Sequence, residues 1–169
     1  KRYQMDDRKP YLWKSHDYGK TWSKIINGIR NDDFLHVIRE DLKIPGLLYA
    51  GGEHEVWVSY NDGENWESIS LNLPDTQISD LIVTEKDLVV GTHGRSIYIL
   101  DDISPIREMS EVRDENPHLY DVYFATRRVQ DAEIKYYLPS TPKKLSIKII
   151  DSKKRIVLEK EGVLNPKSD

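Results

Sequence analysis

Three short charged clusters contain the residue types that could take part in chemistry. Carboxylates are adjacent at Asp6 and Asp7, a histidine lies between two carboxylates in Glu53-His54-Glu55, and His93 is followed closely by Arg95. If such side chains converged at one mouth, they could bind a sugar, a peptide carboxylate or a cation. Paired carboxylates also hydrolyse glycosides, at a separation that a sequence does not give. The clusters are candidate ligand-binding residues, and no residue is assigned a catalytic role.

Each cluster also has a purely structural interpretation. Surface loops are usually charged, and Gly91-Thr92-His93-Gly94-Arg95 is also the pattern of a tight glycine-bearing turn whose arginine pairs locally. Neighbouring strand positions face opposite ways, which disfavours a metal role for residues 53–55. His16, His36 and His118 give no usable signal. The sequence shows no nucleophile elbow, zincin helix or phosphate-binding glycine loop, so neither a cofactor nor a metal is expected.

The composition narrows the classes of partner. The 169 residues include 25 Lys+Arg and 29 Asp+Glu, and this balance lacks the basic stripe of a nucleic-acid binder. The absence of cysteine excludes disulfide scaffolds and Cys-based zinc sites. No apolar run reaches the length of a membrane helix, so no membrane span is expected.

An internal repeat organises the elements that must position the clusters. Ser15-His16-Asp17-Tyr18-Gly19-Lys20-Thr21-Trp22 matches Ser59-Tyr60-Asn61-Asp62-Gly63-Glu64-Asn65-Trp66, which begins 44 residues later. This spacing is that of one four-stranded propeller blade. The repeat therefore predicts successive blades of a β-propeller.

The residue types in the repeat explain how it forms a turn between two strands. The serine hydroxyl and the oxygens of Asp17 or Asn61 can accept backbone N–H bonds that the turn would leave open. Gly19 and Gly63 supply the positive φ that such a turn needs. The tryptophan that ends each of these two eight-residue segments, called Asp boxes below, can fold under the turn and bury a large apolar surface. The predicted structural set is Ser15, Asp17, Gly19, Thr21, Trp22, Ser59, Asn61, Gly63 and Trp66.

Alternating apolar residues predict the strands around these turns. In chain order they are assigned as first, second, third and fourth strands of successive blades. The last predicted blade, which begins at residue 78, lacks an Asp box. Ser104 and Pro105 have the residue types of a helix N-cap and first turn, opening a helix to about Val112. The predicted strands are 34–39 and 78–84 (first), 47–51 and 88–91 (second), 11–15, 56–59 and 96–100 (third), and 22–26 and 66–69 (fourth).

Residues 2–128 resemble the C-terminal end of large bacterial BNR/Asp-box proteins related to the sortilin-type and oligoxyloglucan-hydrolase propellers. The resemblance lies in residues 2–7, 9–11, 37–41, 46–51, 91–96 and 99–102. It departs from the family at Asn61, where an aspartate is usual, although asparagine can make the same acceptor bond. The resemblance implies secretion to an extracellular or periplasmic location. The catalytic carboxylates of the hydrolases lie on blades that have no counterpart in this sequence, so none is transferred to it.

The number of predicted blades suggests that the chain is a fragment. Propellers close with at least about four blades, and the residues before the helix hold little more than two. Because each blade relies on neighbours to cover its apolar faces, the chain is expected to bind the rest of a parent propeller. In isolation, it is expected to self-associate.

The last third reads as a different module. A predicted strand at 118–124 either completes the last blade or leads out of it. Beyond it, short predicted strands at 134–138, 145–149 and 155–160 resemble the opening strands of an Ig-like domain, too few for a complete sandwich. The prediction is thus an all-β chain: partial blades with Asp boxes and a closing helix over 1–113, a linker or exit strand over 114–129, and an incomplete Ig-like segment over 130–169.

Three functions fit this architecture, because propellers host many activities. The first is a non-catalytic structural and ligand-binding part of a secreted propeller, the second is the rim of a glycoside hydrolase, and the third is a sortilin-like peptide- or protein-binding propeller. In a blade meander, the loops between second and third strands lie opposite the Asp boxes. The candidate ligand-binding residues fall on this loop face: Asp6, Asp7, Glu53, His54, Glu55, His93 and Arg95.

Overall fold

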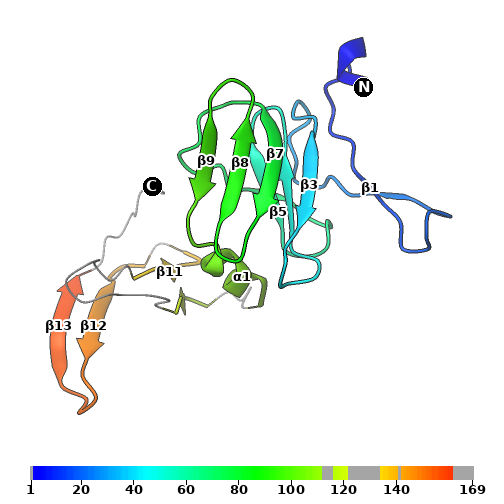
Figure 1. Cartoon of the computed structure of the whole chain (residues 1–169). Helices are drawn as coiled ribbons and strands as arrows, with labels where there is room; N and C mark the ends of the chain where they lie inside the picture. Colours follow the sequence, from blue (N-terminus) through cyan, green and yellow to red (C-terminus); the bar gives the residue numbers. More distant parts are fainter. Residues whose placement is uncertain (1, 112–115, 122–133, 141, 162–169) are drawn as a thin grey trace. The chain divides into compact units, whose positions relative to one another are not determined.

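The computed structural model describes residues 2–111, 116–121, 134–140 and 142–161. The chain divides into two compact units, Lys1–Val112 and Arg113–Asp169, and each is considered by itself (Figure 1). Apart from one α-helix and one short 3-10 helix, the described elements are β-strands in small antiparallel sheets. The predicted all-β fold class is therefore confirmed. No helix in the described ranges is both long and apolar enough to cross a membrane.

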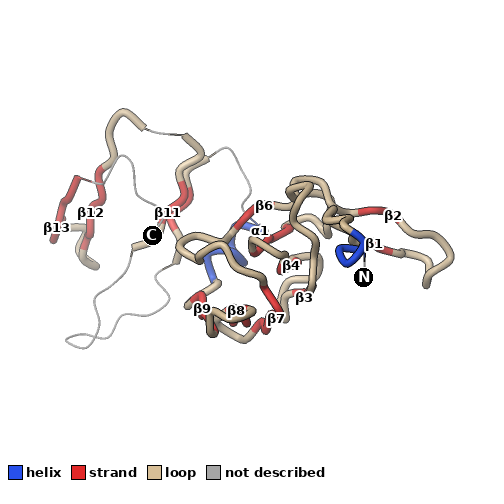
Figure 2. Tube along the Cα trace, turned by 90° about the horizontal axis from the view of Figure 1, so that it is seen from above, coloured by secondary structure: helices blue, strands red, loops and turns tan. Residues whose placement is uncertain are grey.

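The first unit contains three antiparallel sheets that follow one another along the chain (Figures 1 and 2). A 3-10 helix, Arg2–Met5, precedes them. The third sheet is followed by helix α1, Ser104–Glu111. The sheets comprise β1 (Trp13–Lys14) and β2 (Ser23–Lys24); β3 (Val37–Glu40), β4 (Leu48–Gly51), β5 (Val56–Ser59) and β6 (Glu67–Ser68); and β7 (Ile78–Val83), β8 (Leu88–Thr92) and β9 (Ile97–Leu100).

The second sheet is a complete four-stranded meander, and the third pairs β7, β8 and β9 in the same order. Strand β7 packs against β3 and β4, so the two sheets bury their facing side chains between them. This core includes Leu47, Tyr49, Val58, Ile78 and Leu81, each fully buried. Burial raises the pKa of the Tyr49 hydroxyl far above its usual range, and the negative charge of Asp41 raises it further.

The first Asp box forms a turn closed by its own side chains. The Ser15 hydroxyl accepts the Gly19 N–H at 2.7 Å, and the Asp17 carboxylate accepts the Thr21 N–H at 2.8 Å and its hydroxyl at 2.7 Å. These bonds, above all the one from the Thr21 N–H, lower the pKa of Asp17 to about 2. Tyr18 and Gly19 both adopt positive φ.

The second box repeats this geometry. The Ser59 hydroxyl accepts the Gly63 N–H at 2.9 Å, the Asn61 oxygen accepts the Asn65 N–H at 2.9 Å, and Asp62 and Gly63 have positive φ. Its tryptophan, Trp66, is only 3% exposed. The tryptophan of the first box, Trp22, is 59% exposed. The expectation that the box tryptophan is buried is therefore correct for Trp66 and wrong for Trp22.

The difference arises from what precedes each box. The Trp66 indole donates to the Ile25 carbonyl at 3.0 Å, and its backbone N–H donates to the Asn27 carbonyl at 2.8 Å. Gly28, at φ +98°, lies so close that a Cβ there would meet the Trp66 carbonyl oxygen at 2.1 Å. The segment after β2 is thus the surface on which the second box rests. Within the described residues, no corresponding segment lies under Trp22.

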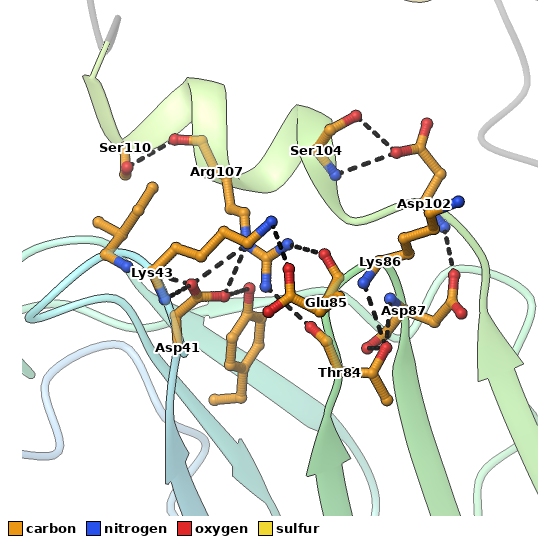
Figure 3. A network of polar contacts seen from close by, with 12 residues as sticks. Asp41, Lys43, Thr84, Glu85, Lys86, Asp87, Asp102, Ser104, Arg107 and Ser110 are labelled. Atoms are coloured by element: carbon orange, nitrogen blue, oxygen red, sulfur yellow. Dashed lines mark hydrogen bonds and ion pairs between the residues drawn. The ribbon is translucent and has the colours of Figure 1, made fainter. Parts of the chain in front are cut away.

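Helix α1 is fixed to the second and third sheets by one buried arginine (Figure 3). Arg107 Nε donates to the Asp41 carboxylate at 3.0 and 3.1 Å, and its terminal nitrogens donate to the Glu85 and Thr84 carbonyls at 2.6 and 3.0 Å. Asp41 also accepts the Lys43 N–H at 2.8 Å. This network connects the β3–β4 loop, the β7–β8 turn and the helix. The helix starts at Ser104 rather than one residue later, and the Asp102 carboxylate accepts the Ser104 N–H at 3.2 Å.

The second unit contains two short antiparallel strand pairs in its described part. Strand β10 (His118–Leu119) pairs with β11 (Tyr136–Tyr137), and β12 (Ser146–Ile150) pairs with β13 (Ile156–Glu161). The β12–β13 turn is closed by Asp151, which accepts the N–H groups of Lys153 and Arg155. Most of the predicted 114–129 linker, including residues 122–124 of the predicted exit strand, lies outside the described residues.

Candidate functional site

The candidate site is built on the loop between β4 and β5, on the side of the blades away from the Asp boxes. Asp33, in the segment before β3, is fully buried beneath this loop. Its carboxylate accepts the His54 N–H at 2.9 Å and the Trp57 indole N–H at 2.6 Å. Burial raises the pKa of Asp33. Gly52 packs directly on it, since a Cβ at that position would lie 2.2 Å from the carboxylate.

Three ion pairs connect the β4–β5 loop to the segments that lead into β3 and β7. Glu53 contacts the His36 ring at 3.0 Å, His54 contacts Asp75 at 2.8 Å, and Glu55 contacts Arg30 at 3.0 Å. The hydrogen bond to Asp75 raises the pKa of His54. Arg30 also contacts Asp32, and the bonds to Asp32 and Glu55 raise the pKa of its guanidinium. All three predicted residues of this cluster thus contact ionisable side chains of neighbouring segments.

Beside these pairs lies a cavity of about 260 Å³. The Tyr3 ring stacks on Phe34, with centroids 4.5 Å apart and planes 15° from parallel, and Phe34 lies 5.0 Å from the His36 ring. An adjacent cavity of about 340 Å³ shares this aromatic wall. The lining of the smaller cavity is Tyr3, Arg8, Phe34, His36, Glu53, His54 and Gln77.

Arg8 is the cation at this cavity whose charge is not matched by a neighbour. It is exposed, and within the described ranges no hydrogen bond or ion pair of its side chain is found. The other basic groups of the lining, His36 and His54, face Glu53 and Asp75. Because an arginine can bind a carboxylate through two parallel hydrogen bonds, the cavity combines an anion-binding group with an apolar wall.

The structure brings together only part of the residue set predicted from sequence. Glu53 and His54 line the smaller cavity, and Asp7 lines the adjacent one while accepting the Tyr11 hydroxyl at 2.6 Å. That bond lowers the pKa of Asp7. Neither cavity includes the remaining four candidates, Asp6, Glu55, His93 and Arg95. The His93 backbone N–H donates to the Gln77 carbonyl at 2.8 Å, and that of Arg95 donates to the Thr92 hydroxyl at 3.2 Å.

Sequence reasoning missed the aromatic wall and the histidine. Tyr3, Phe34, His36 and Gln77 lie in segments leading into the sheets, and their sequence context indicated a resemblance or a strand but no ligand contact. One signal was available: Phe34 and His36 are two residues apart just before a strand, where alternate side chains share a face. No group of three or more potential metal ligands occurs among the residues that the structure describes.

Comparison with known proteins gives one kind of match. Residues of this chain are 34% identical over 68 residues to a "Vacuolar protein sorting/targeting protein 10" of Leptosphaeria maculans, and 34% identical over 73 residues to one of Pyrenophora tritici-repentis. A third, of Pyrenophora teres f. teres, is 33% identical over 75 residues. These alignments cover 40–42% of this chain and 4% of each relative. No protein-family model and no solved structure matches.

Proposed function

We propose that this chain is a non-catalytic part of an Asp-box β-propeller whose loop face binds a peptide or protein ligand. The observation that carries the proposal is the cavity at the β4–β5 loop, where an arginine without a charged partner faces stacked aromatic rings. The similarity to vacuolar protein sorting/targeting proteins favours a protein or peptide ligand over a polysaccharide. Each of these relatives is over twenty times as long as the aligned segment, and the function in their names enters here as support for the proposal.

The electrostatics of the loop favour binding over hydrolysis. Glycosidases need two carboxyl groups facing the scissile bond, one of them protonated as the acid. At this cavity Glu53 is paired with His36, and Asp75 is paired with His54. These carboxylates are held in pairs that fix the loop. The glycoside hydrolase rim remains the second candidate, favoured by the Tyr3–Phe34 stack, because aromatic faces also bind sugars.

A peptide ligand would use the two halves of the cavity differently. A carboxylate, either a C-terminus or an acidic side chain, would pair with the Arg8 guanidinium. An apolar side chain would then pack against Tyr3 and Phe34. The proposed setting is extracellular or periplasmic, with the rest of a propeller completing the binding face.

Binding of the 169-residue chain to arrays of short acidic peptides, printed with free and with amidated C-termini, tests this proposal. We expect Arg8→Met to reduce peptide binding at least about tenfold, which corresponds to about 1.4 kcal/mol. Arg95→Met is the matched control, since Arg95 is an exposed arginine outside both cavities. Equal binding by the Arg8 variant and the wild type would refute the proposed site. Binding to an oligosaccharide array in place of peptides would favour the second candidate.

A further inference from the structure

Strand β9 lies at an open edge of its sheet. The second sheet continues from β5 to β6, but the third ends at β9, and in the described part of the chain no strand pairs with its outer edge. After β9 the chain turns at Asp102, with φ 59°, into helix α1. Arg107 holds that helix against the β3–β4 loop and the β7–β8 turn. Within the described residues, the chain therefore does not return beside β9 in a hairpin, as it does from β5 to β6.

The side chains of β9 are correspondingly uncovered. Ile97, Tyr98 and Ile99 are 67%, 36% and 57% exposed. The β5 residues that hold the same register positions against the preceding strand are buried: Val56 is 2%, Trp57 4% and Val58 0% exposed. An exposed apolar edge of this kind is a template for pairing with another strand.

A cavity marks where the absent strand would pack. In the second sheet Trp66 directly precedes the fourth strand, β6, and rests on the segment Ile25–Ile29. The segment 44 residues later, Ile69–Leu73, borders instead a cavity of about 70 Å³, together with Tyr98, Ile99 and Leu100. The cavity therefore lies where the repeat would place a counterpart of Trp66.

The backbone fixes which residues of β9 can pair outward. The Thr92 N–H donates to the Ser96 carbonyl, so Ser96 and, by strand alternation, Tyr98 and Leu100 direct their backbone groups toward β8. The backbone N–H and C=O groups of Ile97 and Ile99 therefore point away from β8, toward solvent. The same alternation holds in β5, where the Val56 carbonyl accepts the Ile69 N–H from the fourth-strand side.

We propose that a second copy of this chain adds its own β9 antiparallel to this edge, with Ile99 opposite the partner's Ile99. In the second sheet Val58 pairs with Glu67, and the same register places Trp66 opposite Ser59. The dimer register would place the partner's Tyr98 opposite Leu100. Leu100 is the counterpart of Ser59 in β5, so the partner's Tyr98 ring would take the place of Trp66 and enter the cavity. Antiparallel pairing of identical strands is self-complementary and closes with two-fold symmetry. This inference is independent of the proposed ligand site.

Sedimentation equilibrium of the full chain with Ile99→Arg tests the interface. Ile99→Arg would set two like charges opposite each other on the two-fold axis, and we expect the dimer to dissociate at least about tenfold more readily than the wild type. Ile82→Arg is the matched control, because Ile82 is 58% exposed on β7, the strand at the opposite side of the sheet from β9. At a concentration where the wild type is monomeric, both variants should retain its melting temperature, since both positions are exposed in the single chain.

A crosslink reports the register separately. The chain has no cysteine, so an Ile99→Cys variant should form a disulfide-linked dimer under mild oxidation, whereas Ile82→Cys should not. A wild-type chain that stays monomeric at every concentration would overturn the proposal. So would a dimer that persists in Ile99→Arg but is lost in Trp22→Ser, since that would place the interface at the first Asp box.

Discussion

The two Asp boxes form the same turn in opposite surroundings. In each, a serine hydroxyl accepts the glycine N–H and the third residue accepts the N–H of the seventh. Their tryptophans nevertheless differ, with Trp22 59% and Trp66 3% exposed. The same contrast separates Trp13, 51% exposed, from Trp57 one repeat later, 4% exposed. The turn is thus encoded within eight residues, whereas tryptophan burial depends on the neighbouring blade.

The largest expected effect is on the tryptophans themselves. Trp66→Ala should lower the free energy of unfolding by about 3–5 kcal/mol, because it opens a cavity between the first two sheets. Trp22→Ala should lower it by less than about 1 kcal/mol, as expected for a surface residue. Urea denaturation of the two variants measures the difference. Equal losses would mean that Trp22 is covered in solution and that the comparison fails.

Two glycines sharpen the comparison. Gly28→Ala would combine a left-handed φ with a Cβ against the Trp66 backbone, and we expect a loss of about 2–4 kcal/mol. Gly19 also has a left-handed φ, but the nearest atom to an added Cβ would be 3.7 Å away in Trp22. Gly19→Ala should therefore cost only the backbone strain, about 1–2 kcal/mol. Thermal melts of both variants test the order, and a larger loss for Gly19→Ala would contradict it.

The boxes should also differ in their response to acid. The pKa of Asp17 is lowered to about 2, chiefly by the Thr21 N–H, so its contribution to stability is present above the usual aspartate pKa. That contribution is lost as the pH falls through the range from about 4 to 2. Asp17→Asn should flatten the pH dependence of the melting temperature in this range, and Asn61→Asp should steepen it. No change in slope in either variant would show that the carboxylate bonds do not form.

The smallest effect on stability is expected on the loop face. There, stability is lost as the pH rises, whereas at the first Asp box it is lost as the pH falls. Asp75 raises the pKa of His54, so the protonated pair stabilises the fold below the usual histidine pKa of about 6.5. This stabilisation is lost as the pH rises through the raised value. NMR titration of the His54 ring should show the raised pKa, and Asp75→Asn should return it toward the usual value. An unchanged titration in the variant would exclude the pair.

The sequence allowed the meander to be predicted because alternation and turn chemistry are local. The predicted strands at 56–59 and 88–91 agree with β5 and β8 within one residue. Other strands are shorter than predicted: β2 covers two residues of 22–26, and β3 begins at Val37 rather than Phe34. Phe34 and His36 instead line the cavity. They were not predicted as site residues because the pattern of residues 34–39 indicated a strand.

The candidate site was less predictable because its geometry comes from contacts across loops. Glu53 and His54 were identified by their charge, but their partners His36 and Asp75 lie 17 and 21 residues away. The buried Asp33 that supports the loop resembles any surface aspartate in the sequence. Arg95 was chosen because its loop was predicted to lie on the same face, but it lies outside both cavities.

The most direct test of the account is hydrogen exchange at the indole N–H groups of the four tryptophans, measured by NMR at a concentration where the chain is monomeric. The account predicts strong protection of Trp57 and Trp66, which donate to Asp33 and to the Ile25 carbonyl. It predicts faster exchange at Trp13 and Trp22, whose side chains are exposed. The Trp22 indole donates to the Gly19 carbonyl at 3.1 Å, but this bond lies within its own exposed turn. Equal protection of all four would contradict the claim that a blade buries its tryptophans only against a preceding neighbour.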